Sequence, residues 1–391
     1  MATIIFKPTE ACNAACAYCE VDSKGWRSTK FMPHDILELL FVRISEFLME
    51  TESEYIELIW HGGEPLLLGV EYFETALRFQ RKHCSAVFGR IHHRIQSNIT
   101  IFSEKFVPVF REMGISVIGT SYDPVEGIRV LRKDKQSIEY NRLFMQGARL
   151  LEKNGFSWGV IYVVTKRSLD EPLDLFNYMT NLAPDASVRF NPVTVDNPAH
   201  EHLKITPDEF TEFLGAIFPV WWKYRERYRK VEPFSSLLRG IMSPEGRTFC
   251  CTDSGRCVNT HINLGPDGRW SLCGRSADWG LLDYGSVFDR TISQVFSDPR
   301  RDELRLRNDF LASGECNGCS YWPVCHGGCP LDAYITTGSM MKRSNWCKSK
   351  RDFMDSYFFP ISGLTPRYLS QKPATGRPCV NASIPGTEYP A

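Results

Sequence analysis

Three cysteines lie close together near the N-terminus, directly after an apolar run typical of a β-strand. Cys12, Cys16 and Cys19, the N-terminal triad, are spaced C-x3-C-x2-C and follow Ile4-Ile5-Phe6. Three thiolates on one short loop can bind three irons of a cubane iron–sulfur cluster and leave the fourth iron without a protein ligand. An open coordination position distinguishes a catalytic metal site from a structural one. A zinc site or three unrelated core thiols are alternatives, because short motifs also occur by chance.

A second group of cysteines lies near the C-terminus. The chain has 14 cysteines, and nine of them fall between residues 250 and 347. Their order is Cys251-x5-Cys257-x10-Gly268-x4-Cys273, then Cys316-x2-Cys319-x5-Cys325-x3-Cys329, then Cys347 after a gap. Disulfides and zinc sites are both alternatives for such a segment. Lys7 and Glu10 interrupt the first apolar run, so no secretory signal segment supports disulfides.

Strand-like and helix-like patterns alternate through the first half of the chain. The strand-like segments are Thr3–Phe6, Tyr55–Trp60, His92–Gln96, Ser116–Thr120, Trp158–Val164 and Ser187–Phe190. Apolar residues at helical spacing occupy His34–Met49, Glu71–His83, Ser103–Glu112, Ile138–Lys153 and Leu173–Leu182. This alternation predicts an α/β protein built from parallel βαβ units. The loop that carries Cys12 follows the first predicted strand. In barrels built from parallel βαβ units, the functional site forms at the carboxyl ends of the strands.

The N-terminal triad, with Tyr18 before its third cysteine, resembles the signature of radical S-adenosylmethionine (SAM) enzymes. The resemblance implies a partial (β/α)6 barrel over residues 1–205. It also implies that the open iron chelates the amine and carboxylate of SAM, and that an electron from the cluster cleaves SAM to a 5′-deoxyadenosyl radical.

The later cysteines resemble the SPASM domain, which holds two auxiliary [4Fe-4S] clusters and here spans residues 247–350. The implied ligands of the first auxiliary set are Cys251, Cys257, Cys273 and Cys329. Those of the second auxiliary set are Cys316, Cys319, Cys325 and Cys347. Four protein ligands per cluster point to electron transfer and make three [4Fe-4S] clusters in all. Cys84, Cys250 and Cys379 are expected to be bystander or structural thiols.

The resemblance also implies a set of SAM contacts at the strand ends. Gly62-Gly63-Glu64 is similar to the motif that receives the SAM amino group, and Ser121-Tyr122-Asp123 matches S-x-D-G except for Pro124. An arginine downstream, Arg129 or Arg132, would pair with the SAM carboxylate, although a surface arginine is the simpler interpretation of each. The implied SAM-binding residues are Tyr18, Gly62, Gly63, Glu64, Gln96, Asn98, Ser121, Asp123, Arg129 and Arg189.

Charge and hydropathy exclude some partners. Lys and Arg total 46, as do Asp and Glu, so no bulk field favours nucleic acid or an anionic membrane. No apolar run reaches the length of a membrane span, and we expect a soluble cytoplasmic protein. Residues 206–246 read as a helical bridge, beginning with an N-cap at Thr206 and a proline in the first turn. Residues 351–391 read as a C-terminal tail that is extended beyond Tyr357.

SPASM proteins mostly modify peptides and proteins, so the expected partners are a precursor peptide and an electron donor of the flavodoxin or ferredoxin type. The triad starts at residue 12, so leader recognition is expected to need a separate partner or the C-terminal region. The cysteine spacing resembles that of anaerobic sulfatase maturases, which have an aspartate that acts as a base directly after the third cysteine of the first auxiliary set. This chain has Gly274 there, and Asp278 is either the replacement base or an ordinary surface aspartate. We therefore favour a peptide crosslinking maturase of the cyclophane type. Oxidation of Cys or Ser to formylglycine and a non-enzymatic zinc scaffold are the alternatives.

Overall fold

The computed structural model describes residues 1–21, 31–51, 54–133, 136–182, 186–195, 198–228, 230–242 and 251–364. These residues form two compact units. Unit 1 contains Met1–Arg167, Val193–Lys204 and Val258–Arg305, and unit 2 contains Ser168–Pro192, Ile205–Cys257 and Leu306–Ala391. Cys250 and Cys379 lie outside the described residues, as does the tail beyond residue 364. The predicted domain boundaries stay predictions, and the two units divide the chain along different lines.

Unit 1 is built on a parallel sheet, which confirms the predicted α/β class. Its first five strands are β1 (Ala2–Phe6), β2 (Ile56–Trp60), β3 (Ile91–Gln96), β4 (Val117–Ser121) and β5 (Ser157–Val164). Each pairs in parallel with the next, and Phe6 at the end of β1 lies opposite Trp60 at the end of β2. The carboxyl ends of these strands therefore meet at one edge, where the loops that follow them come together.

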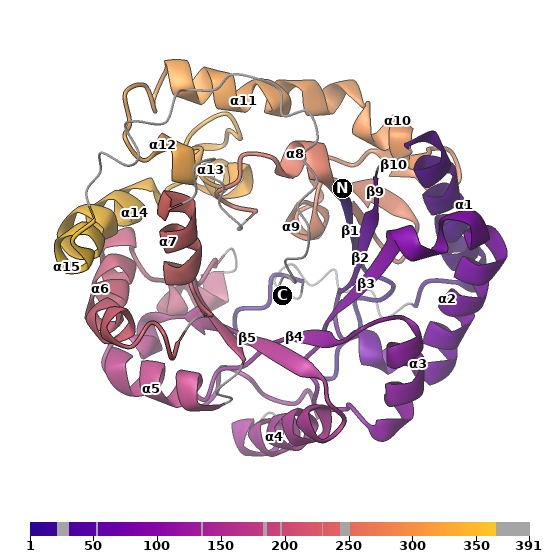
Figure 1. The fold of residues 1–391 in the computed structure, drawn as a ribbon, viewed down its shortest axis with the longest axis horizontal. Helices are drawn as coiled ribbons and strands as arrows, with labels where there is room; N and C mark the ends of the chain where they lie inside the picture. The colour runs from indigo at the N-terminus through magenta and orange to yellow at the C-terminus, as the bar shows by residue number, and fades with distance from the viewer. Residues whose placement is uncertain are drawn as a thin grey trace. The chain divides into compact units, whose positions relative to one another are not determined.

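Four helices cover this sheet on its outer side (Figure 1). They are α1 (His34–Glu50), α2 (Val70–His83), α3 (Val107–Glu112) and α4 (Ser137–Lys153), with short 3-10 turns at Pro65–Leu68, Ser85–Arg90 and Glu104–Phe106. In α1 the apolar residues repeat every three or four positions, and Leu37, Leu40 and Ile44 are fully buried. Burying such a stripe against the sheet stabilises a helix more than its intrinsic propensity does.

The sequence analysis did not predict three short strands at the other edge of β1. β8 (His261–Leu264) runs parallel to β1, β9 (Arg269–Ser271) is antiparallel to β8, and β10 (Gly285–Ser286) follows β9. Gly268 makes the turn before β9 with φ +78°, a conformation that glycine adopts without strain. Around these strands lie α8 (Cys257–Thr260), α9 (Gly274–Asp278), α10 (Ile292–Phe296) and a 3-10 turn at Pro299–Arg301. Residues 258–305 thus extend the sheet of unit 1.

Unit 2 is mainly helical. It contains α5 (Pro172–Leu182), the parallel pair β6 (Ser187–Pro192) and β7 (Val231–Glu232), α6 (Pro207–Lys223), α7 (Phe234–Met242), most of α11 (Asp302–Ser313), α12 (Trp322–Cys325) and α13 (Pro330–Thr337). The 3-10 turn Pro198–Leu203 belongs to unit 1. The predicted N-cap of α6 is confirmed, because Thr206 and Glu209 form a reciprocal capping box.

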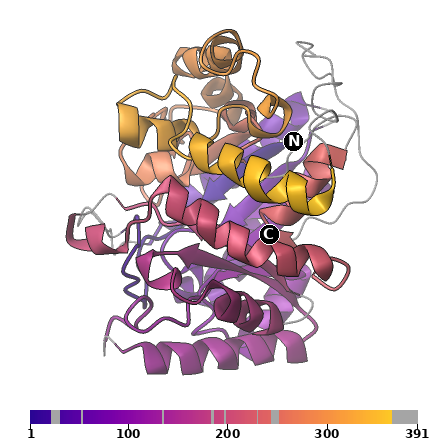
Figure 2. The same cartoon turned by 90° about the vertical axis from the view of Figure 1, so that its left-hand side faces the viewer.

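The C-terminal helices of unit 2 pack along α6 (Figure 2). They are α14 (Cys347–Phe353), a π-helical turn at Met354–Phe358 and α15 (Phe359–Ser362). The Thr211 hydroxyl lies 3.0 Å from the Ser349 hydroxyl, and the rings of Phe218 and Phe358 stack 5.2 Å apart. The prediction of an extended chain beyond Tyr357 is wrong for residues 359–362, because aromatic packing keeps them helical. Within the described residues, no helix is long and apolar enough to cross a membrane.

Candidate active site

The loop that carries the N-terminal triad follows β1 and is held by two neighbouring segments. The Ala15 N–H donates to the Val130 carbonyl at 2.9 Å, and the Gly63 N–H donates to the Thr9 carbonyl at 3.0 Å. These bonds join the loop of residues 9–19 to the segments that follow β4 and β2. The three cysteines thereby lie at the carboxyl edge of the sheet, where ligands bind in open α/β folds.

Gly62 and Gly63 are required by the close approach of this loop. A Cβ atom at Gly62 would lie 2.1 Å from the Thr9 carbonyl oxygen, and one at Gly63 would lie 2.1 Å from that of Ala11. Gly62 also has φ +117°, which disfavours any side chain. The two glycines therefore seat the cysteine loop itself. Their predicted contact with SAM stays a prediction.

N–H groups surround the triad sulfurs. The Cys12 sulfur accepts from the Ala14 N–H at 3.4 Å and from the Asn98 side-chain amide at 3.7 Å, and the Cys16 sulfur accepts from the Arg129 guanidinium at 3.5 Å. All three triad cysteines are partly exposed. Donors aimed at sulfur stabilise thiolates and clusters bound through them. The residues present therefore fit an anionic iron–sulfur cluster.

Glu64, the acidic residue after β2, is a fully buried carboxyl group at 0% exposure. It accepts hydrogen bonds from the Leu66 N–H at 2.9 Å, the Asn98 N–H at 2.6 Å and the Ser97 hydroxyl at 2.8 Å. Burial raises the pKa of Glu64 from 4.5 to about 7, and these bonds only partly offset it. No basic side chain of the described chain forms an ion pair with it. A buried carboxylate without a cation partner is suited to receive a ligand ammonium group.

Arg129, Asp123 and Tyr18 form a buried network beside Cys16. The Arg129 Nε lies 2.5 Å from an Asp123 carboxylate oxygen, and the Tyr18 hydroxyl bonds to both Arg129 and Asp123. The second Asp123 oxygen accepts the Val163 N–H at 3.1 Å. The Arg129 guanidinium thus already has carboxylate and sulfur partners, and its predicted bond to the SAM carboxylate stays a prediction.

The remaining predicted SAM residues are placed in both units. The Gln96 amide donates to the Ser121 hydroxyl at 3.3 Å, so the ends of β3 and β4 carry adjacent polar groups. Asn98 follows β3 and also bonds to Asn13 of the cysteine loop at 2.9 Å. Arg189 lies on β6, which belongs to unit 2, whereas the other predicted SAM residues belong to unit 1.

Lys7 and Asp278 form a buried ion pair that sequence analysis missed. Their charged atoms are 2.6 Å apart, the side chains are 2% and 6% exposed, and the Lys7 ammonium also donates to the Gly274 carbonyl at 3.0 Å. Burial, and secondly the Lys7 charge, lower the pKa of nearby His61 to about 4. A Cβ atom at Gly274 would lie 3.1 Å from Lys7 Cε. The candidate base Asp278 is therefore paired with Lys7. The sequence signal for this pair was a lysine directly after an apolar strand.

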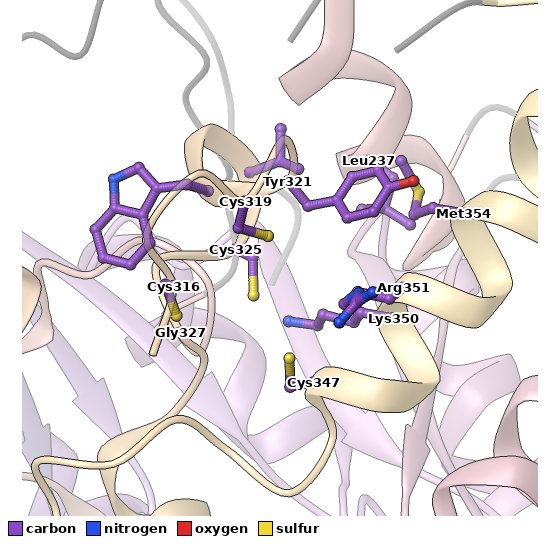
Figure 3. Close-up of a pocket in the computed structure, with 12 residues that line it drawn as sticks. Leu237, Cys316, Cys319, Tyr321, Cys325, Gly327, Cys347, Lys350, Arg351 and Met354 are labelled. Carbon is purple, nitrogen blue, oxygen red and sulfur yellow. The ribbon is translucent and has the colours of Figure 1, made fainter. Parts of the chain in front are cut away.

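The second auxiliary set lines one pocket of unit 2. Cys316, Cys319, Cys325 and Cys347 turn their sulfurs toward a common space in Figure 3, with Lys350 and Arg351 beside it. Leu237, Val324 and Met354 close the apolar side. Burial raises the pKa of Cys325 to about 12, so this thiol would lose its proton on binding iron. Four convergent cysteines with cations nearby fit a four-iron cluster.

The first auxiliary set is divided between the units, with Cys273 in unit 1 and Cys251, Cys257 and Cys329 in unit 2. Their joint ligation of one cluster stays a prediction. Among the described residues, no three His, Cys, Asp or Glu side chains converge tightly enough to hold a single metal ion. The zinc alternative therefore finds no preformed single-ion site there.

The described residues form a parallel α/β sheet with a three-cysteine loop after its first strand and, after its second, a buried carboxyl that has no ion-pair partner among them. These are the features that the resemblance to radical SAM enzymes implies. The comparison with known families agrees, since the radical SAM superfamily matches residues 6–179. Residues 6–179 are therefore a radical SAM domain, and the chain is an enzyme; this domain implies the use of SAM and a [4Fe-4S] cluster.

Individual relatives cover most of the chain. It is 24% identical over 375 residues to a cysteine-type anaerobic sulfatase-maturating enzyme of Clostridium perfringens, an alignment covering 92% of this chain and 96% of the relative. The solved structure of native anSMEcpe with bound AdoMet superposes with a TM-score of 0.78 at 21% identity, covering 92% and 98% of the two chains. Streptococcus suis SuiB bound to precursor peptide SuiA gives a TM-score of 0.58 at 14% identity, covering 89% and 76%. The two structural matches show a shared fold.

Proposed function

We propose that this enzyme is a peptide or protein maturase that oxidises a substrate side chain, with an intramolecular crosslink as its favoured product. The proposal is supported by the matched relatives, one named as a sulfatase-maturating enzyme and one solved with a precursor peptide. The cofactors, when bound, supply a carbon radical strong enough to remove a hydrogen atom from an unactivated carbon. The protein binds, orients and encloses the reacting groups.

Glu64 is proposed to receive the ammonium group of SAM. It is a buried carboxyl with three hydrogen-bond donors and no cation partner among the described residues, so an ammonium supplies the charge that the fold omits. Tyr18, Ser121 and Asp123 are proposed to border the rest of SAM. The Arg129 network would hold Tyr18 in a fixed orientation.

The observation that supports the crosslink preference is the pairing of Asp278 with Lys7 in α9. Gly274 has no side chain, and Asp278 has its carboxylate 2.6 Å from the Lys7 ammonium. The Lys7 ammonium donates a hydrogen bond to Asp278 Oδ1, so this oxygen is already engaged within the protein. Formylglycine formation needs a base for a hydroxyl or thiol proton, whereas a substrate radical that has added to an aromatic ring has a more acidic proton to lose.

The proposed reaction removes two hydrogens from the peptide. One leaves as a hydrogen atom from a side-chain β-carbon, and that carbon then bonds to a neighbouring ring. The other leaves as a proton, to water or to a basic side chain, and an electron, which restores aromaticity. We propose that the two auxiliary clusters take up this electron and pass it to a donor protein of the flavodoxin or ferredoxin type. We also propose that a separate partner protein binds the leader of the precursor peptide.

Sulfatase maturation is the second candidate, because the alignment with the sulfatase-maturating enzyme covers 92% of this chain. In that case Asp278 would act as the base after transfer of Lys7 to another partner. A Cβ atom added at Gly274 would lie against Lys7, so a carboxylate introduced at position 274 would compete with Asp278 for the Lys7 ammonium.

The test offers the reconstituted enzyme two substrates under anaerobic conditions with SAM and a reductant. One is a sulfatase-derived peptide, and the other is a precursor encoded beside its gene. We expect a precursor product about two mass units lighter, the loss of two hydrogens in a radical closure, with fragmentation missing between the joined residues. We expect little aldehyde on the sulfatase peptide from the wild type. Aldehyde formation that disappears in Asp278→Asn would establish the second candidate and overturn the first.

A further inference from the structure

Arg307, on α11, is a buried guanidinium in unit 2 that no motif singled out. It is 4% exposed and donates to five backbone carbonyls, as many as its N–H groups. The acceptors are Met340 at 2.7 Å, Lys342 at 2.7 Å, Gly328 at 3.0 Å, Gly327 at 3.2 Å and His326 at 3.5 Å. Every N–H group of the Arg307 side chain therefore donates to a backbone carbonyl.

The chain bends sharply to present these carbonyls. His326, Gly327 and Gly328 are three consecutive residues in the left-handed region, with φ +49°, +75° and +73°. They form the whole connection between Cys325 and Cys329, one from each auxiliary set. Arg307 thus lies against the short loop that joins the two predicted cluster sites.

The hydrogen-bond acceptors of Arg307 are neutral carbonyls, so they supply no negative charge to balance its positive charge. No carboxylate of the described chain forms an ion pair with it, and an arginine in a protein does not lose its proton. Burial lowers its pKa, and the groups that oppose this shift are cysteines of both auxiliary sets: first Cys329 and Cys257, then Cys316 and Cys325. A buried charge is stable only when it is paired, so this arrangement calls for anions at the cysteines.

We propose that Arg307 is the shared counter-charge of the two auxiliary clusters and holds their reduction potentials high enough to accept an electron. A four-iron cluster with four thiolate ligands is an anion, and each added electron increases its negative charge, so a nearby fixed cation favours the reduced form. Arg307 is a positioning residue, because it acts through the cysteines and their loop. This inference rests on the two auxiliary clusters of the proposed function, but not on the substrate.

The experiment is a redox titration of the full chain, followed by electron paramagnetic resonance. Replacing the N-terminal triad with alanine isolates the auxiliary signals, and iron content is measured in each sample. Arg307→Gln removes the charge, and Arg307→Lys keeps it while losing the guanidinium fork. Arg90→Gln is the matched control, because Arg90 also donates to three backbone carbonyls, those of Leu48, Thr51 and Glu54, in unit 1.

We expect Arg307→Gln to shift the auxiliary midpoints to more negative potentials, Arg307→Lys to stay nearer the wild type, and Arg90→Gln to leave them unchanged. If the glutamine variant cannot retain auxiliary iron, retention by the lysine variant supports the counter-charge role. Unchanged midpoints in an iron-replete glutamine variant overturn the proposal. An equal loss of auxiliary iron in the lysine and glutamine variants also overturns it, because Arg307 would then only hold the loop in place. Wild-type protein without auxiliary iron would instead refute the clusters themselves.

Discussion

SAM binding should depend on pH through Glu64, because the pKa of this carboxyl is about 7 rather than 4.5. If only the carboxylate receives the SAM ammonium, about one molecule in eleven is competent at pH 6 and about half at pH 7. The dissociation constant should then fall about five-fold over that interval, or about 1 kcal/mol. Glu64→Gln should weaken binding at neutral pH by about 1.5–3 kcal/mol, the value of a hydrogen bond to a charged group, and lose the pH dependence.

Equilibrium dialysis of labelled SAM against anaerobically reconstituted protein measures both effects from about pH 6 to about pH 7, where an α-amino group with a pKa of about 7.7–8.0 stays mostly protonated. Glu57→Gln is the matched control, because Glu57 lies near the amino end of β2, away from the site at its carboxyl end, pairs with Arg94 at 3.2 Å and is 22% exposed. Wild-type affinity that stays constant over this range would refute the reasoning. So would a glutamine variant that keeps the wild-type pH dependence.

The same residue makes a prediction about stability with the opposite sign. A carboxyl whose folded pKa is raised holds its proton more tightly in the folded state than in the unfolded state. The free energy of unfolding of ligand-free protein should therefore fall as pH rises from about 4.5 to about 7, by about 3 kcal/mol for this group, and stay level above that. Glu64→Gln lacks this penalty, so its melting temperature should exceed that of the wild type at pH 8 and not at pH 5. An unchanged difference between the two pH values would contradict the burial of an uncompensated carboxyl.

Three further predictions follow from the cysteine sites and the buried ion pair. Reconstituted protein should contain about twelve irons, and replacing the N-terminal triad with alanine should leave about eight and abolish SAM cleavage; iron assay and deoxyadenosine chromatography check this, and full cleavage in the variant would disprove the triad's role. Cys316→Ala should eliminate product while deoxyadenosine still forms, because the SAM cluster has its own ligands, and unchanged product by mass spectrometry would exclude an essential auxiliary cluster. Lys7→Met should destabilise the fold by about 3–5 kcal/mol, since Asp278 is left buried and unpaired, and Lys7→Met with Asp278→Leu should recover much of the loss; chemical denaturation measures both, and equal stability of the two variants would show that the pair is not coupled.

Much of the fold was predictable because it depends on local patterns. The predicted bounds of β1 to β5 agree with the structure to within one residue, since each is a short segment with β-branched or aromatic residues that have one or both faces buried. Strands β8 to β10 were not predicted, because runs of two to four residues carry no periodicity and gain their stability from pairing with β1. The helical turn after Tyr357 escaped prediction for the same reason: its helicity depends on aromatic neighbours distant in sequence.

The sequence by itself determined the class of chemistry, because ligand spacing on a short loop is a local property. The cysteine triad, the auxiliary cysteines and Glu64 after β2 are all recognisable without coordinates, and their place at strand ends follows from parallel topology. Only the tertiary structure decided how these groups are charged and held. The pairing of Lys7 with Asp278, the commitment of Arg129 to Asp123, and the isolation of the Arg307 charge all involve burial and partners far apart in the chain. Desolvation sets the cost of each charge, and a linear sequence does not show which charges lose their water.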